Sequence, residues 1–198
     1  GKIIDIDNWE GKKHYLWFKK YPIHYYSINK IMDISNFYQY IKANNLSFFI
    51  PFVYLLNRAL NEFPEFRLRK VDDGVILYDV IHPAYTIMTE DGIFDNCEHE
   101  YNTDFEVFYA DGLKAIDKGK KGVQDKPYND ESRFDQFYFT SLPWIDFISG
   151  THPMPLNDSD YIPRIVWSKY TNNDGKINLT MGIQVSHAFV DGYPLALG

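Results

Sequence analysis

The sequence predicts an α+β domain, a two-layer sandwich in which helices pack on one face of a mixed β-sheet. Three observations predict this class. Apolar residues recur at three- and four-residue spacing in some segments, which is typical of amphipathic helices. Other segments are short β-branched and aromatic runs bounded by Asp-Gly turns, which is typical of strands. Aromatic residues make up 18% of the 198 residues, a composition that suits a strand-rich core.

Three segments have helical character. Residues 35–43 begin with a serine whose hydroxyl can cap a helix. Residues 47–63 carry the strongest apolar periodicity, and Pro51 lies near the first turn, where a missing N–H costs least. Residues 104–118 repeat the spacing, with Gly112 as a weak point in the pattern.

Strands are predicted for the remaining apolar runs. They cover residues 75–78, 84–88, 137–142, 162–170 and 176–186. The last two are expected to form a hairpin across residues 171–175. In its second arm apolar residues alternate with polar or small ones, so one face should be buried. His187 continues this alternation and is expected to enter the interior at the end of the strand.

Composition argues against several classes of protein. The formal charge of -7 and the scattered basic residues argue against a nucleic-acid partner. The single cysteine, Cys97, excludes an intramolecular disulfide and a Cys-based zinc cluster, and it fits a reducing cytosol. The longest mostly apolar run, residues 46–56, is too short to cross a bilayer, and no long apolar signal core stands at the N-terminus. We therefore expect a cytoplasmic protein with no membrane partner, folded as a single domain over residues 1–198.

The chemistry of the chain is concentrated in the motif of residues 187–192, His-Ala-Phe-Val-Asp-Gly. His187 can take up a proton near neutral pH. Asp191 can hold the local turn by ion pairing or by accepting backbone N–H bonds, and Gly192 permits a tight exit of the backbone. A core histidine beside a turn would give the same short pattern, so the motif alone leaves both interpretations open.

The motif follows a long alternating strand, and in this setting it resembles the signature of coenzyme A-dependent acyltransferases. The chain is similar in particular to the chloramphenicol acetyltransferase family. The matching segments keep their order along nearly the whole chain: Asp7-Asn8-Trp9, His14-Tyr15, residues 31–35, Tyr54-Leu55, residues 57–61, Glu65-Phe66-Arg67, Leu142-Pro143-Trp144 with Phe147, and Gln184-Val185 before His187.

The resemblance implies the fold and the reaction of that family. It implies a homotrimer with active sites at subunit boundaries, acetyl-coenzyme A as co-substrate and a small-molecule alcohol as acceptor. His187 is implied as the general base that removes the hydroxyl proton, with one ring nitrogen bonded to its own backbone carbonyl. The alkoxide then attacks the thioester directly, so no acyl-enzyme forms.

Two further catalytic positions depart from the family pattern. Thr140 stands where the family has a serine that donates to the oxyanion, and Ser141 should point to the opposite face of the strand. The family aspartate matched by Asp191 pairs with an arginine, but that position is Gly11 here. Lys12 is the first candidate to replace that arginine as the partner of Asp191.

The resemblance also assigns the binding residues. The acceptor pocket is expected to involve Ile23, Tyr25, Trp144, His152 and Val166. Several of these residues differ in size or polarity from those of the family, which puts chloramphenicol itself in doubt as the acceptor. Lys169 and Tyr170 are expected to hold the 3′-phosphate and adenine of the co-substrate. The family ends in a further helix, which we expect to be missing from a chain that stops at Gly198.

Three alternatives remain open. The altered positions favour a catalytically impaired family member that binds a small molecule. The same signature occurs in dihydrolipoyl acyltransferase cores, which form cages and work with a carrier domain, but no lipoyl segment or linker is found in this sequence. A metalloenzyme is the weakest alternative, because His187 and Asp191 are too few ligands and the other histidines lack matching spacing. We therefore expect no metal.

Overall fold

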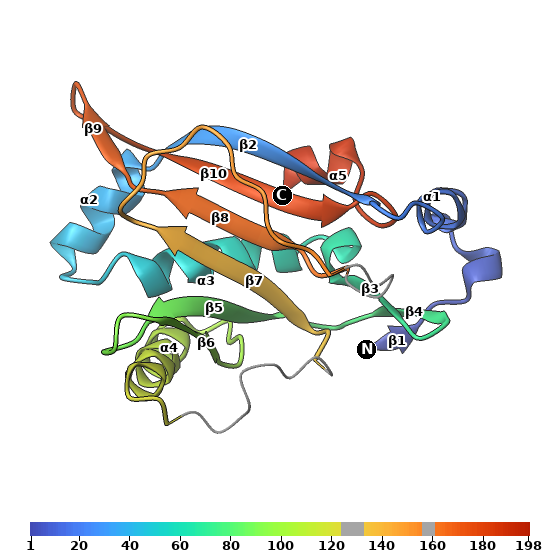
Figure 1. The fold of residues 1–198 in the computed structure, drawn as a ribbon, viewed down its shortest axis with the longest axis horizontal. Helices are drawn as coiled ribbons and strands as arrows, with labels where there is room; N and C mark the ends of the chain where they lie inside the picture. The colour runs from blue at the N-terminus through green and yellow to red at the C-terminus, as the bar shows by residue number, and fades with distance from the viewer. Residues whose placement is uncertain (124–132, 156–160) are drawn as a thin grey trace.

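The computed structural model describes residues 1–123, 133–155 and 161–198. Its main sheet has the strand order β2-β10-β8-β7-β5-β6, with β9 paired to β10. Figure 1 shows this sheet running from β2 at the top of the view to β6 near the bottom. Neighbours β5, β7 and β8 are parallel, and the other pairs are antiparallel. The strands are β2 (Tyr25–Asp33), β5 (His82–Met88), β6 (Phe94–Glu98), β7 (Gln136–Leu142), β8 (Arg164–Ser168), β9 (Thr171–Asn173) and β10 (Lys176–Ser186).

A small antiparallel sheet and the helices complete the fold. The small sheet has the order β1 (Lys2–Ile3), β4 (Gly74–Leu77) and β3 (Leu68–Val71). The helices are α1 (Lys12–Phe18), α2 (Ser35–Ala43), α3 (Phe49–Asn61), α4 (Phe105–Lys120) and α5 (Gly192–Leu197), with short 3-10 turns at Ile6–Asn8 and Pro64–Arg67. The mixed sheet with helices on one face confirms the predicted α+β class.

One face of the main sheet is buried against helices. Helix α3 lies behind the strands in Figure 1, and its Phe49 and Phe52 contact Trp167 of β8 with ring centroids 5.5 and 5.1 Å apart. Phe139 of β7 packs against the same indole. These odd-numbered positions of β7 and β8 are fully buried because side chains alternate between the two faces of a strand.

The opposite face is crossed by the chain that follows β7. In Figure 1 this orange segment passes in front of β8 and β10 toward β2. Gly150 donates its backbone N–H to Asn29 Oδ1 (3.3 Å). Gly182 of β10 makes room for that amide, since a Cβ there would lie 2.4 Å from Asn29 Oδ1. Two further hydrogen bonds hold the segment on the sheet. Lys169 donates its backbone N–H to the carbonyl of Ile145, and His152 donates its backbone N–H to Gln184 Oε1.

Most of the predicted elements are confirmed within a few residues. Helix α2 has the expected bounds, and α3 begins two residues later than expected. The predicted hairpin loop is wrong in its length. Residues Thr171–Asn173 form strand β9, and the turn contains only Asp174 and Gly175, with φ of 52° and 84°. Positive φ at both central residues is the geometry of a tight two-residue hairpin.

Several elements were not predicted. The largest is the nine-residue strand β2, whose apolar side chains Ile28 and Ile31 are exposed and do not alternate cleanly. Helix α5, which begins at Gly192, the last residue of the motif, was also not predicted. None of the helices in the described residues is long and apolar enough to span a membrane.

Candidate active site

His187 lies where β10 ends. Its backbone N–H donates to the carbonyl of His24 (2.7 Å), which extends the pairing of β10 with β2 by one residue. The imidazole stacks on Phe18 (centroids 4.1 Å apart, planes 8° apart) and lies 4.8 Å from the ring of Tyr26. Tyr26 is opposite Val185 in register, so the ring lies on the face that the alternation predicted.

The ring of His187 is held by the rings of Phe18 and Tyr26, and no carboxylate among the described residues bonds it. Its Nδ1 is buried, and none of the described residues provides a hydrogen-bond partner for it. A bond from this nitrogen to its own backbone carbonyl stays a prediction. The stacking on Phe18 fixes the plane of the imidazole. The ring nitrogens stand at the edge of that plane, so a polar partner has to approach the ring from its edge.

Asp191 caps helix α5. Its carboxylate accepts the backbone N–H of Tyr193 (3.0 Å) at the helix N-terminus, where an acidic side chain is favourable. The pKa of Tyr26 is raised mainly by burial of its ring and secondly by the charge of this carboxylate. The Tyr26 hydroxyl donates to the carbonyl of Val190. Asp191 therefore holds the local turn by accepting a backbone N–H, one of the two arrangements that the sequence left open.

The expected ion pair between Lys12 and Asp191 is wrong. Lys12 Nζ bonds Asp7 Oδ1 (2.7 Å) instead. The arginine of the family does not fit at Gly11 without a rearrangement, because a Cβ there would lie 2.3 Å from the ring of Trp9. The loop after His187 is held by packing: Phe189 is buried and its ring stacks on Tyr15.

Thr140 lies on the sheet face that the crossing segment covers. It is opposite Val166 of β8, which is opposite Gly182 of β10. Ser141 is opposite Trp167 and therefore points toward the helices, as the alternation predicted. Thr140 is half-buried, and Val166 is buried beside it.

The structure does not bring Thr140 and His187 together within one chain. Asn29 is opposite Gly182 and shares the face of Thr140, whereas Tyr26 shares the face of His187. At about 3.4 Å per residue, Gly182 precedes His187 by roughly 17 Å along β10. The two side chains are thus on opposite faces of the sheet and far apart.

The two residues expected at the co-substrate are also far from His187. Lys169 is exposed, and its backbone N–H donates to Ile145 of the crossing segment (2.9 Å). The ring of Tyr170 packs on Phe48 and Tyr38 near the start of α3. The next residue, Thr171 of β9, is opposite Asn178, roughly 30 Å along β10 from His187.

The residues expected in the acceptor pocket differ in how far they are exposed and in where they lie. Ile23 and Trp144 are exposed, each at 65%. Tyr25 is half-buried and contacts His24 edge to face. His152 donates its backbone N–H to Gln184 Oε1 (3.4 Å), on the same face as Val166.

Sequence reasoning missed Gln184 as a pocket residue. It is 4% exposed, and its Oε1 also accepts from the hydroxyl of Ser27 (3.0 Å). Burial and the nearby charge of Arg164 lower the pKa of His152 to about 4. The missed signal was the polar and small residues at even positions of β10, which suggested a face exposed to solvent.

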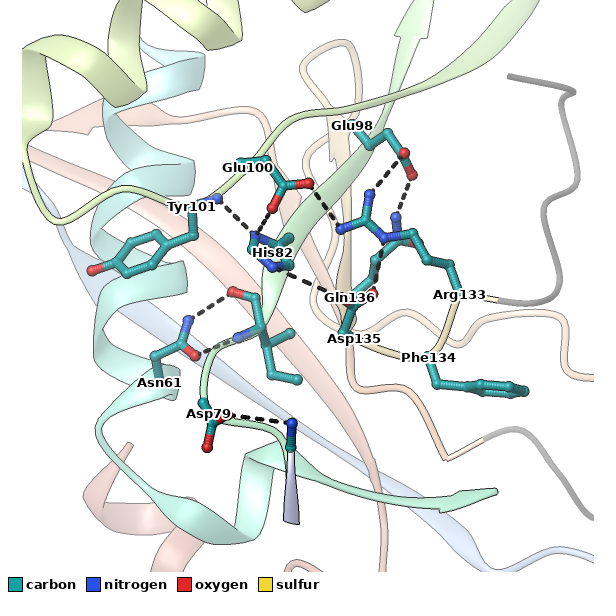
Figure 2. Close-up of polar contacts among 12 residues, drawn as sticks. Asn61, Asp79, His82, Glu98, Glu100, Tyr101, Arg133, Phe134, Asp135 and Gln136 are labelled. Carbon is teal, nitrogen blue, oxygen red and sulfur yellow. Dashed lines mark hydrogen bonds and ion pairs between the residues drawn. The ribbon is translucent and has the colours of Figure 1, made fainter. Parts of the chain in front are cut away.

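A second polar cluster ties strands β5, β6 and β7 together (Figure 2). Arg133 bonds Glu98 and Asp135 at 2.9 Å each and Glu100 at 3.2 Å. His82 Nδ1 lies 2.9 Å from both a Glu100 oxygen and the backbone N of Tyr101. Gln136 contacts the second oxygen of Glu98. We call these residues (His82, Glu98, Glu100, Arg133, Asp135 and Gln136) the Arg133 network.

The Arg133 network has the features of a structural cluster. An open groove of about 580 Å³ lies beside it, lined among others by Arg58, Glu62, Asp79 and Tyr101. None of the polar side-chain atoms of the network is buried without a hydrogen-bond partner. Within the described ranges, no three His, Cys, Asp or Glu side chains are grouped so that they could hold a metal ion.

Comparison with known proteins points in one direction. The sequence profile of the family described as chloramphenicol acetyltransferase matches residues 2–197. A chloramphenicol acetyltransferase of Bacillus pumilus is 31% identical over 195 residues, covering 97% of this chain and 87% of the relative. One from Escherichia coli is 29% identical over 192 residues, covering 96% and 86%.

Solved structures agree with the sequence relatives. A structure described as chloramphenicol acetyltransferase superposes with a TM-score of 0.89 at 29% identity, covering 99% of this chain and 94% of that one. A dihydrolipoamide acetyltransferase of Azotobacter vinelandii superposes with a TM-score of 0.64 at 17% identity, covering 94% and 82%. The second likeness shows a shared fold alone.

Proposed function

Because the chain belongs to the chloramphenicol acetyltransferase family, whose members are acyltransferases, we propose that it transfers an acetyl group from acetyl-coenzyme A to a hydroxyl of chloramphenicol or a related small alcohol. The observation that carries the proposal is the position of His187. The residue ends a buried strand, and its ring is held between Phe18 and Tyr26. We also propose that the protein acts in the cytoplasm.

In this mechanism His187 is the general base. A neutral imidazole takes the hydroxyl proton on Nε2 as the alcohol oxygen attacks the thioester carbonyl. The buried Nδ1 has no hydrogen-bond partner among the described residues. A bond from it to its own backbone carbonyl, formed in the assembled enzyme, would keep the ring in the required tautomer. The hydroxyl of Thr140 donates to the carbonyl oxygen as it becomes negative. When the carbon–sulfur bond breaks, the imidazolium returns its proton to the leaving sulfur.

The separation of the two groups of residues supports a site built from two subunits. His187 and Thr140 lie on opposite faces of the sheet in one chain, so one subunit would supply the base and its neighbour the oxyanion donor. The free edge of β2 and the nearby crossing segment expose Ile28, Ile31 and Ile148, which are suited to such a contact. We propose a homotrimer, with Lys169 and Tyr170 holding the 3′-phosphate and adenine of the co-substrate and Ile23, Tyr25, Trp144, His152 and Val166 at the acceptor.

The assay follows the free thiol released from acetyl-coenzyme A with chloramphenicol as acceptor. Wild type should release thiol in proportion to acceptor consumed, and His187→Ala should not. A mass measurement in native conditions should give three times the mass of one chain. Absence of turnover with every acceptor, or identical turnover in the two proteins, would contradict the proposal.

A binding protein without turnover is the second candidate, favoured by Gly11. Glycine at this position supplies no guanidinium for Asp191, so the motif loop lacks that ion pair, and a Cβ there would meet the ring of Trp9. Calorimetry separates the two functions: chloramphenicol binding without thiol release supports the second, and turnover that depends on His187 excludes it.

A further inference from the structure

The sheet face beneath the crossing segment holds a buried amide with unused hydrogen-bonding capacity. Gln184 is 4% exposed, and its Oε1 accepts from Ser27 and from the backbone of His152. No described residue bonds its Nε2, which is also buried. Burying a donor without a partner is costly, so such a donor is available to a bound water or to a polar group of a ligand.

His152 presents a second such atom next to Gln184. Its Nε2 is buried and has no hydrogen-bond partner in the described part of the chain. The ring is neutral at pH 7 because burial and the positive charge of Arg164 lower its pKa to about 4. Arg164 itself donates to the carbonyl of Ile162, and its guanidinium lies over the ring of Tyr138.

These atoms share a sheet face with the proposed oxyanion donor, Thr140 of β7, which lies two strands and about 10 Å across the sheet from Gln184 of β10. Arg164 is opposite Gln184 in register, and Val166 is opposite Gly182. The two rows are adjacent on the same face, about 7 Å apart along the strands, and Thr140 lies in the second row. A small molecule whose hydroxyl reaches the carbonyl held by Thr140 therefore extends over Gln184 and His152.

We propose that Gln184 and His152 determine acceptor specificity by binding a hydrogen-bond-accepting oxygen of the alcohol, such as that of a carbonyl, carboxylate or nitro group. The inference rests on the proposed function, because it places the second substrate in this pocket. The amide N–H of Gln184 is a donor, and the neutral imidazole of His152 is a second donor in the tautomer that carries its proton on Nε2, which is the tautomer that the proposal requires. The charge of Arg164 favours an electron-rich group. An alcohol without such a group would leave both donors unpaired and would bind weakly.

The test uses two variants, a matched control and two acceptors. The variants are Gln184→Met and His152→Leu, which keep size and remove the donors. Gln39→Met makes the same exchange at an exposed position of α2. Chloramphenicol supplies carbonyl and nitro oxygens, and 3-phenylpropanol is an aromatic alcohol without them.

Each variant should lower kcat/KM for chloramphenicol at least tenfold, mainly through KM, and leave kcat/KM for phenylpropanol unchanged or higher. The control should match wild type with both acceptors. Equal losses with both acceptors would mean that the residues only support the fold. No change with either acceptor would overturn the inference as well.

Calorimetry separates this inference from the proposed function. If wild type releases no thiol, transfer fails, but chloramphenicol binding still reports on the pocket. A tenfold or greater loss of affinity in Gln184→Met would then support the pocket without the reaction. Equal affinity in the two proteins, or no binding to wild type, would overturn it.

Discussion

The Arg133 network and the adjacent pair Gln184 and His152, where we propose that the acceptor binds, are both polar clusters beside the same sheet, and they differ in whether their hydrogen bonds are complete. In the network Arg133 bonds three carboxylates, and no buried polar atom is left without a partner. In the pair the buried nitrogens of Gln184 and His152 have none among the described residues. A closed cluster stabilises the fold, whereas an open one is suited to a ligand. Polarity alone therefore does not mark a functional site.

The largest effect we expect is on activity and comes from His187. His187→Ala should lower kcat by about 10²–10⁴-fold, because general base catalysis contributes that much. The melting temperature should change little, since the residue is only half-buried and its ring makes no hydrogen bond to a neighbour through Nδ1. Steady-state kinetics and thermal unfolding of the same preparation check both values. A large loss of stability with the loss of activity would assign His187 to the core.

The opposite pattern is expected from the Arg133 network. Arg133→Met removes the ion pairs that Arg133 makes with the partly buried carboxylates of Glu98 and Asp135, and should cost about 2–4 kcal/mol of unfolding free energy. The specific activity of the folded fraction should be unchanged. Urea unfolding provides the first value and thiol release the second.

Arg58→Met is the matched control for this change. Arg58 is exposed and its Nε lies 4.0 Å from Glu62, so its removal should cost about 0.5 kcal/mol or less. If Arg133→Met lowered activity without lowering stability, the Arg133 network would be part of a functional site. The distinction between this network and the pair Gln184 and His152 would then be wrong.

The pH dependence of stability tests a third buried cluster. His99 is buried, its Nδ1 contacts the hydroxyl of Tyr85, and burial lowers its pKa to about 4. Because the unfolded chain binds the proton first, the stabilisation is present above about pH 6.5 and is lost as the pH falls toward 4. Between pH 7 and 5 this group should account for up to about 2 kcal/mol of lost unfolding free energy.

The variant His99→Phe should flatten that loss. Its unfolding free energy, measured in urea at pH 7 and pH 5, should differ less between the two values than that of wild type. His82 also has a lowered pKa through burial, but Glu100 and Asp135 oppose the shift, so His82→Phe should flatten the curve less. An identical slope in wild type and His99→Phe would show that His99 takes up its proton in the folded state.

Most helices and strands could be predicted from the sequence because apolar periodicity is a local pattern. Alternation along β10 correctly placed Val185 against the core and His187 at the strand end. Strand β2 escaped prediction because Ile28 and Ile31 are exposed on an edge strand, where the hydrophobic pattern is not imposed by a core. The pairing of β2 with β10 is a long-range contact that no local pattern reports.

The site was predicted less completely for a related reason. The motif singled out His187 and Asp191, but Lys12, chosen because it stands next to Gly11 at the position of the family arginine, was the wrong partner for the aspartate. Gln184 carries no motif of its own, and a polar residue at an even position of a strand looks solvent-facing until a crossing segment covers it. The site that we propose at Gln184 and His152 is built from three strands and the crossing segment, so it can be recognised only in the folded chain.

The smallest effect is expected from Lys12, which forms an ion pair with Asp7 at the surface. Lys12 bonds Asp7, whose side chain is 86% exposed, and such pairs contribute about 0–1 kcal/mol. Lys12→Met should therefore change the unfolding free energy by about 0.5 kcal/mol or less and leave kcat/KM unchanged. Asp191→Ala, which removes the cap of α5, should lower both the stability and the activity. A loss of activity in Lys12→Met as large as that in Asp191→Ala would mean that the two residues pair in the assembled enzyme.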